Sequence, residues 1–106
     1  METIIIPTNK GLQFYNTDNI IRIQGMSNYC KIYFAYNSYP LTVARVLHWF
    51  EQHLPAGVFW RTHKTHLVNS GYVKQFHTAQ KRYMGLRNGE ILVVSRRRAT
   101  LLKNVA

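Results

Sequence analysis

Short runs of β-branched and aromatic residues, each closed by turn-forming residues, constrain the fold of this chain more than any other sequence feature. Runs of this kind are typical of strands, and short turns between them favour antiparallel neighbours. The expected strands cover residues 3–6, 12–15, 20–24, 29–33, 39–41, 59–62, 72–76, 83–86 and 91–94. Because side chains alternate along a strand, Ile21 and Ile23 are expected to share one face, with Arg22 and Gln24 on the other. The pattern predicts a mainly β fold with antiparallel sheets.

Two stretches depart from the strand pattern and predict helices. The first carries apolar residues at the spacing of one helical face, namely Val43, Val46, Leu47, Phe50 and Leu54. Thr42 is its expected N-cap and Pro55 its stop, which makes it the one expected core helix. A short C-terminal helix is expected over residues 95–105, beginning at Ser95 because serine is a good N-cap residue. Its expected packing residues are Leu101, Leu102 and Val105.

Two connections have predictable local structure. Asn88-Gly89 lies between the strands expected at residues 83–86 and 91–94, and this dipeptide favours a two-residue hairpin turn. Residues 63–68 follow a strand and end in an apolar pair, so we expect one short helical turn with Leu67 and Val68 inward.

The size and cysteine content of the chain limit its class. A length of 106 residues predicts a single domain, residues 1–106, with a modest core. No apolar run approaches the roughly 18 residues of a membrane span, and the N-terminus lacks the pattern of a signal peptide. The single cysteine, Cys30, excludes an intrachain disulfide and fits a reducing, cytoplasmic location.

Positive charge is concentrated in the C-terminal half. The chain has 14 Lys and Arg residues against four acidic ones, a net charge of +10. Residues 1–60 carry a net charge of +1, whereas residues 61–106 carry +9 with Glu90 as their one acid. Solubility does not require such asymmetry, so the charge predicts a polyanionic partner, with nucleic acid favoured over an acidic membrane.

Two local stretches sharpen this expectation. Residues 59–69 turn from apolar to basic and back without an acidic residue. Ser95 is followed by Arg96, Arg97 and Arg98, in the first turn of the expected helix. Cations are unfavourable at the positive end of a helix dipole. Three arginines there therefore indicate an anionic ligand rather than a need of the fold.

Two blocks in this half carry a resemblance to a known family. Residues 61–69 read RTHKTHLVN, and residues 88–98 read NGEILVVSRRR. In order and spacing they are similar to the F-x-R-x-H-[RK]-S-x-L-V-N block and the later N-G and P-V-S-R signals of LytTR DNA-binding domains. Thr65 replaces the usual serine and Val94 the usual proline. A weaker likeness at NIIRIQ and Asn28-Tyr29 extends the resemblance over roughly residues 11 to 102.

The resemblance implies both a fold and a function. The implied fold is an elongated domain of stacked antiparallel β-sheets, with the core helix and the short C-terminal helix. The implied function is sequence-specific binding of double-stranded DNA through loops, in bacterial transcription regulation, without enzyme activity or a cofactor. The family usually forms the output domain of a two-component response regulator. A receiver or membrane domain absent from this chain, and a second copy on repeated half-sites, are therefore implied partners.

The resemblance also implies roles for particular residues. Carried over by motif, Asn28, Asn69 and Arg96 are expected to contact DNA. Arginine can hold guanine O6 and N7, and asparagine can pair with adenine or donate to a phosphate. The basic residues His63 and Lys64 are assigned to phosphates. Ser95 and Arg98 complete the expected set, whereas Arg97 is expected to be solvated.

Three other interpretations were open from the residues alone. His63 and His66, with His77 and Cys30 elsewhere, are a weak zinc signal, because His-x-x-His lacks the spacing of a strong ligand set. A metal-independent nuclease using His63, Lys64 and His66 is a second alternative, since such chemistry needs no carboxylate. A β-rich protein-interaction module is a third, but it leaves the charge of the C-terminal half unexplained.

Overall fold

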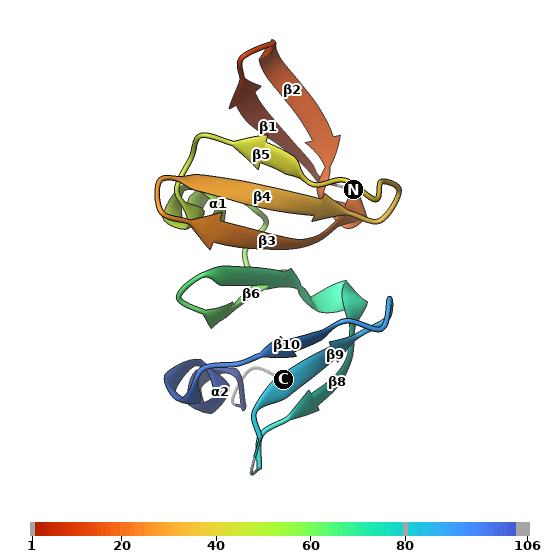
Figure 1. The fold of residues 1–106 in the computed structure, drawn as a ribbon, viewed down its shortest axis with the longest axis vertical. Coiled ribbons are helices and arrows are strands. Elements are labelled where there is room, and N and C mark those ends of the chain that lie inside the picture. Colours follow the sequence, from red (N-terminus) through yellow and green to blue (C-terminus); the bar gives the residue numbers. More distant parts are fainter. Residues whose placement is uncertain (1, 80, 104–106) are drawn as a thin grey trace.

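Three antiparallel sheets stack along the long axis of the molecule (Figure 1). The structure, a computed structural model, describes residues 2–79 and 81–103. The principal extents of the molecule are 44 × 25 × 23 Å. This arrangement confirms the mainly β, elongated fold with two helices.

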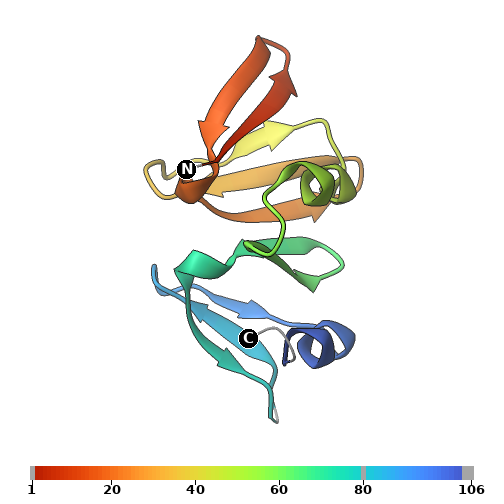
Figure 2. The ribbon, with the colours of Figure 1, turned by 180° about the vertical axis from the view of Figure 1, so that it is seen from behind.

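The central sheet has five strands in the order β5-β4-β3-β7-β6. They are β3 (Ile20–Met26), β4 (Tyr29–Phe34), β5 (Leu41–Val43), β6 (Phe59–His63) and β7 (His66–Asn69). Along β4, Cys30, Ile32 and Phe34 are buried in alternation with half-buried residues, as the pleat of a strand requires. Helix α1 (Leu47–His53) packs Leu47 and Phe50 into the same apolar cluster. The main core therefore lies between this sheet and α1 (Figure 2).

An N-terminal hairpin closes one end of the main core. Strands β1 (Thr3–Thr8) and β2 (Gly11–Asn16) form a separate two-stranded sheet. Ile4 and Ile6 point into the main core and are at most 2% exposed. Gly11 has φ +97°, a conformation that a glycine adopts without steric cost in the turn between the strands.

A C-terminal sheet and α2 form the other end of the molecule. The strands are β8 (Val73–His77), β9 (Tyr83–Leu86) and β10 (Ile91–Val93), in the order β10-β9-β8. Helix α2 (Arg96–Lys103) buries Ala99 and Leu102 beside Met84 and Val94, and Trp60 of β6 packs against this cluster. Through Trp60, the start of α2 is positioned against the central sheet.

Residues 63–68 form a β-hairpin, so the expected helical turn is wrong. Strands β6 and β7 pair around the two-residue turn Lys64-Thr65. Leu67 and Val68 are both buried although they point to opposite faces of β7. A strand that is covered on both faces loses the polar–apolar alternation by which strands are recognised.

Ile21 and Ile23 do not share a face, contrary to expectation. Ile23 lies in the main core, while Ile21 belongs to a second apolar cluster. The buried members of this second cluster are Ile21, Val68 and Leu86, from the central and C-terminal sheets. The cause is a shift in the β3–β4 register between Ile20 and Arg22. Such a bulge changes the face on which the following residues lie.

Helix α1 is shorter than expected and begins at Leu47 rather than after Thr42. Val43 instead ends β5, where it pairs with Cys30, so the expected edge strand at residues 39–41 lies two residues later. Val46 is the N-cap, has extended backbone angles and is 49% exposed. Strand pairing of this segment therefore outweighs its helical periodicity.

The β9–β10 turn has three residues rather than two. The Leu86 N–H donates to the Glu90 carbonyl at 2.8 Å, which leaves residues 87–89 as the loop. Gly89 has φ +91°, as expected for the left-handed residue that ends three-residue hairpin loops.

The packing of α2 also differs from expectation. Leu101 is 50% exposed, and Ala99 occupies the buried position one turn earlier than Leu102. Val105, the third expected packing residue, lies outside the described residues.

Candidate nucleic-acid interface

Three segments that are distant in sequence meet along one side of the molecule. They are the β3–β4 turn (Ser27-Asn28), the β6–β7 turn (Lys64-Thr65) and the start of α2 (residues 95–98); we call them together the basic edge (Figure 1). The Gly25 N–H donates to the Thr65 carbonyl at 2.8 Å, which joins the first two segments. The Ser95 N–H donates to the Thr62 carbonyl at 3.0 Å, which joins α2 to β6.

The β3–β4 turn presents Asn28 to solvent. Met26 and Tyr29 are paired on either side of a two-residue turn, and Ser27 has φ +59°. A positive φ at the first central position matches the twist of a β-hairpin. Asn28 is exposed, so its amide can approach an external ligand.

The Arg61 side chain stabilises the β6–β7 turn by donating hydrogen bonds to its backbone. The Arg61 Nε donates to the His63 carbonyl at 2.7 Å, and its terminal nitrogens donate to the Lys64 carbonyl and to Glu51 of α1. The Arg61 side chain is only 17% exposed. Lys64 is exposed at the tip of the turn, so its ammonium group is free to reach an anion from a fixed backbone.

His63 is arranged as a hydrogen-bond donor. Its Nδ1 accepts the Thr65 N–H at 3.3 Å and lies 2.9 Å from the Thr65 hydroxyl. Because a backbone N–H can only donate, Nδ1 is the acceptor and the ring proton belongs on Nε2. Thr65, the departure from the family's serine, keeps the hydroxyl that this arrangement uses.

His66 is held neutral. It is half-buried, and burial, with contributions from the charges of Arg22 and His63, lowers the pKa of His66 to about 4. The ring centroids of His63 and His66 are 6.4 Å apart. At neutral pH, His66 therefore brings no positive charge to the edge.

The start of α2 places two exposed arginines beside these turns. The Ser95 hydroxyl accepts the Arg98 N–H at 3.3 Å, so Ser95 caps the helix as expected. Arg96 and Arg97 are exposed, and Arg98 is half-buried. The N-terminus of α2 and these arginines are all positively charged, so this part of the surface favours an anionic ligand.

Asn69 does not lie on the basic edge. It is 5% exposed, and its amide nitrogen donates to the Ile20 carbonyl at 2.9 Å while its oxygen accepts the Gly71 N–H at 2.9 Å. The expected DNA contact from Asn69 is therefore inconsistent with the structure. The side chain instead connects the end of β7 to the start of β3.

Two acidic residues, Glu51 of α1 and Glu90 of the β9–β10 connection, are paired with arginines. Glu51 accepts from Arg61. Glu90 accepts from Arg22 Nη2 at 2.9 Å, and this hydrogen bond holds the pKa of Glu90 below its usual value. The guanidinium of Arg22 also lies 3.7 Å from the centroid of the Tyr33 ring. Within the part of the chain that the structure describes, no ion pair involves Lys64, Arg96, Arg97 or Arg98.

The weak zinc signal has no structural counterpart in the described part of the chain. Across residues 2–79 and 81–103, no three His, Cys, Asp or Glu side chains are grouped so that they could hold a metal ion. Cys30 is fully buried, and burial raises the pKa of its thiol to about 11. In the same residues, no helix is long and apolar enough to cross a membrane.

Sequence reasoning missed Arg61 and Glu51 as positioning residues. In the sequence, Arg61 is one of several basic residues within residues 59–69, and Glu51 is a single acidic residue of the expected core helix. Their pairing depends on α1 lying against β6, which no local pattern reveals. The one available signal is that Arg61 stands three residues before the first turn residue, close enough for its side chain to reach the turn carbonyl of Lys64.

Comparison with known proteins identifies the relatives of this chain. The family model of the LytTr DNA-binding domain matches residues 10–106. A solved LytTr DNA-binding domain, from a protein of Bacillus cereus described as a methyl-accepting/DNA response regulator, superposes with a TM-score of 0.80. The alignment covers 99% of this chain and 96% of the other at 19% identity, so it supports the shared fold. No curated protein matches. The family match over nearly the whole chain shows that it belongs to the LytTr DNA-binding domain family.

Proposed function

We propose that the chain binds double-stranded DNA at a specific sequence through the basic edge, and so regulates transcription in bacteria. The observation that carries this proposal is the meeting of the β3–β4 turn, the β6–β7 turn and the start of α2 on one side of the molecule (Figure 1), in a chain that belongs to a family of DNA-binding domains. These three segments carry Asn28, Lys64 and Arg96. All three side chains are exposed. They come from segments that hydrogen bonds hold together, so one surface can contact one duplex.

The residue types suggest a division of roles. Arg96 is proposed to read guanine O6 and N7 in the major groove, because its planar fork matches these two acceptors. Asn28 is proposed to pair with a base edge or a phosphate. Lys64, His63 through Nε2–H, and Arg98 are proposed as phosphate ligands. Ser95 acts mainly through capping and positions the arginines that follow it.

The test is selection of bound duplexes from a random DNA pool, followed by footprinting of the selected sequence. We expect a consensus sequence and a protected region on it. Affinity for the selected duplex should exceed that for a scrambled duplex of equal composition by about 10³-fold or more at moderate salt. Equal affinity for both duplexes would leave only charge-driven binding and contradict the proposal.

The nuclease alternative receives little support from the site. A general acid or base needs a pKa near the working pH, whereas the pKa of His66 is lowered to about 4. The imidazole nitrogen of His63 next to Thr65 is already an acceptor in the turn. We expect purified protein to bind DNA and RNA fragments without cleaving them, which gel analysis after prolonged incubation would reveal.

We further propose the setting that the family implies. The domain acts in the cytoplasm, with two copies occupying repeated half-sites of one DNA target. A receiver or a membrane segment in the same regulatory system supplies the signal. Footprint length and the mass of the protein–DNA complex distinguish one bound copy from two.

A further inference from the structure

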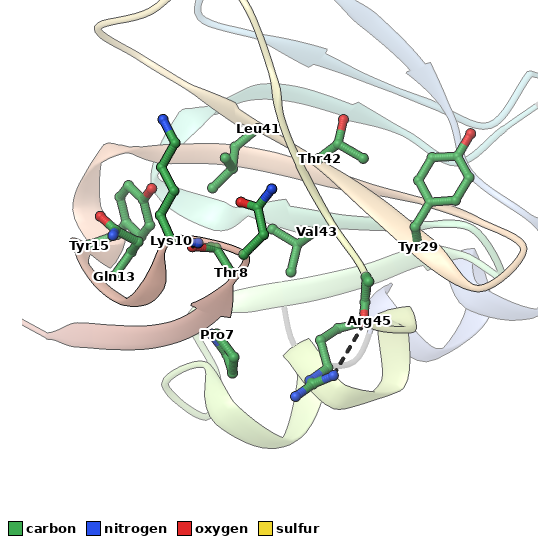
Figure 3. A pocket seen from close by; sticks show the side chains of 12 residues that line it. Pro7, Thr8, Lys10, Gln13, Tyr15, Tyr29, Leu41, Thr42, Val43 and Arg45 are labelled. Carbon is green, nitrogen blue, oxygen red and sulfur yellow. Dashed lines mark hydrogen bonds between the residues drawn. The ribbon is translucent and has the colours of Figure 1, made fainter.

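A cleft of about 690 Å³ lies between the β1–β2 hairpin and the end of β5 (Figure 3). Lys10 lies on the hairpin side, and Arg45 on the connection between β5 and α1. Tyr29, the first residue of β4, also lines the cleft. None of the twelve lining residues is acidic. The cleft is therefore open to an anion.

The two cations of the cleft have no acidic partner among the described residues. Among the described residues, Glu90 pairs with Arg22, and Glu51 pairs with Arg61 and His48, so neither carboxylate pairs with a cation of the cleft. Within residues 2–79 and 81–103, the Arg45 guanidinium donates only to the neighbouring Ala44 carbonyl, at 3.3 Å. Its guanidinium carbon lies 5.8 Å from the centroid of the Trp49 ring. Lys10 and Arg45 are both exposed, and their charges are available to a ligand.

The cleft lies next to the basic edge, because Tyr29 belongs to the cleft and borders the β3–β4 turn. Strands β4 and β5 are antiparallel, and Cys30 lies opposite Val43. Tyr29, which lines the cleft together with Arg45, directly follows Asn28 of the β3–β4 turn. Figure 1 shows the β5–α1 connection on the same side of the molecule as the β3–β4 turn, the β6–β7 turn and α2. The cleft continues the basic edge at the end remote from α2.

We propose that this cleft holds the sugar-phosphate backbone beside the DNA sequence read by the basic edge, with Lys10 and Arg45 as phosphate ligands. The inference rests on the proposed function. Duplex DNA is favoured over a small anion because both cations are exposed and the cleft adjoins a surface for a polyanion. The 44 Å length of the molecule corresponds to about 13 base pairs at about 3.4 Å each, enough for an additional flanking contact.

The test uses three duplexes that contain the selected sequence. One extends well beyond it on both sides, and each of the others is cut at one boundary. Lys10→Ala and Arg45→Ala should each weaken binding to the long duplex and reduce the slope of log K against log salt by about 0.9. On the duplex cut on the cleft side, each variant should bind as the wild type does. On the duplex cut on the opposite side, each variant should still bind more weakly than the wild type.

Lys74→Ala is the matched control, because it removes one exposed cation from β8 of the C-terminal sheet. If Lys10→Ala and Arg45→Ala behave like Lys74→Ala on the long duplex, the cleft is not a phosphate site. A loss of affinity that persists on the duplex cut on the cleft side also overturns the proposal. If Arg45→Ala lowers the melting temperature, the result for Lys10→Ala decides whether the cleft binds phosphate. The Lys10 side chain is exposed in a turn, so its removal should not destabilise the fold. Failure of the wild type to prefer the selected duplex would instead refute the proposed function.

Discussion

Arg96 occupies a position where a positive charge does not help the helix. It is exposed in the first turn of α2, where the helix dipole disfavours cations. Arg96→Ala should therefore leave the melting temperature unchanged or slightly raised. If Arg96 reads a guanine, binding of the selected duplex should weaken by about 1–3 kcal/mol, and the preference at one base pair should disappear.

Arg97→Ala is the natural control for Arg96, since it removes an equal charge from the next exposed position. Its effect on the ratio of selected to scrambled binding should be small. Arg96→Lys should keep much of the non-specific affinity but little of the specificity, because lysine lacks the planar fork. An unchanged ratio for Arg96→Ala would show that this residue contributes charge alone.

His66 should make folding stability depend on pH. Its pKa is about 4 in the folded chain and near 6.5 in an exposed chain. As pH falls from about 6.5 to about 4, the unfolded chain takes up a proton that the folded chain does not, so stability falls. His66→Gln should flatten the melting temperature across this range, measured by calorimetry. The exposed His77→Gln should retain the wild-type dependence, and a His66→Gln curve that still falls equally would contradict this assignment.

The lowered pKa of Glu90 acts in a different range. Its carboxylate is stabilised by Arg22, so its contribution is fully present above about pH 4.5 and is lost as pH falls through the lower folded value. The pH at which stability falls therefore distinguishes the contribution of His66 from that of Glu90.

At the scale of elements, the β6–β7 hairpin depends on the Arg61–Glu51 pair. Arg61→Lys keeps the charge but cannot donate to both turn carbonyls and to Glu51 at once. We expect a loss of about 1–3 kcal/mol in stability, since the hydrogen bonds of a largely buried charged group are removed. We also expect a lower ratio of selected to scrambled binding, because the turn is less well fixed.

The comparison that isolates this effect is Lys64→Ala, which removes the proposed phosphate ligand but leaves the backbone of the turn intact. It should weaken all duplexes about equally and reduce the salt slope by roughly one at most. If Arg61→Lys lowers the melting temperature without changing the ratio of selected to scrambled binding, the Arg61–Glu51 pair contributes to folding stability but not to DNA recognition.

Sequence patterns predicted elements well where each strand had one buried face. The alternation of Cys30 and Ile32 on β4 is an example. Prediction failed on β7, where Leu67 and Val68 are buried on opposite faces, and at Val43, whose pairing with Cys30 replaces a helical turn. These errors share a cause, since contacts from residues far along the chain outweigh local pattern.

The candidate site was predictable in part for a related reason. Exposed basic residues at turns, such as Lys64, stand out in a sequence by charge and position. Asn69 could not be distinguished from a DNA contact, because an asparagine that bonds buried backbone looks the same in sequence. Arg61 acts through α1, a partner that only the folded chain brings near.

At the scale of the whole molecule, the charge asymmetry should appear in the salt dependence of binding. If Lys64, Arg98 and one further cation each neutralise a phosphate, log K should fall with log salt with a slope of about −2.7 or steeper. Titrations of the selected duplex between low and moderate salt measure this slope. A flat response would favour a protein partner over DNA.

The backbone of the basic edge is already ordered before any ligand arrives. Its segments are connected by the hydrogen bonds from Gly25 to Thr65 and from Ser95 to Thr62, and the two strands that flank each of its β-turns are paired with each other. Association should therefore not require a disordered segment to fold. The heat-capacity change on binding should match the surface buried at the interface, without the excess that accompanies coupled folding. In thermodynamic terms, the proposed binding surface is preformed, and binding carries no cost of folding a segment of the chain.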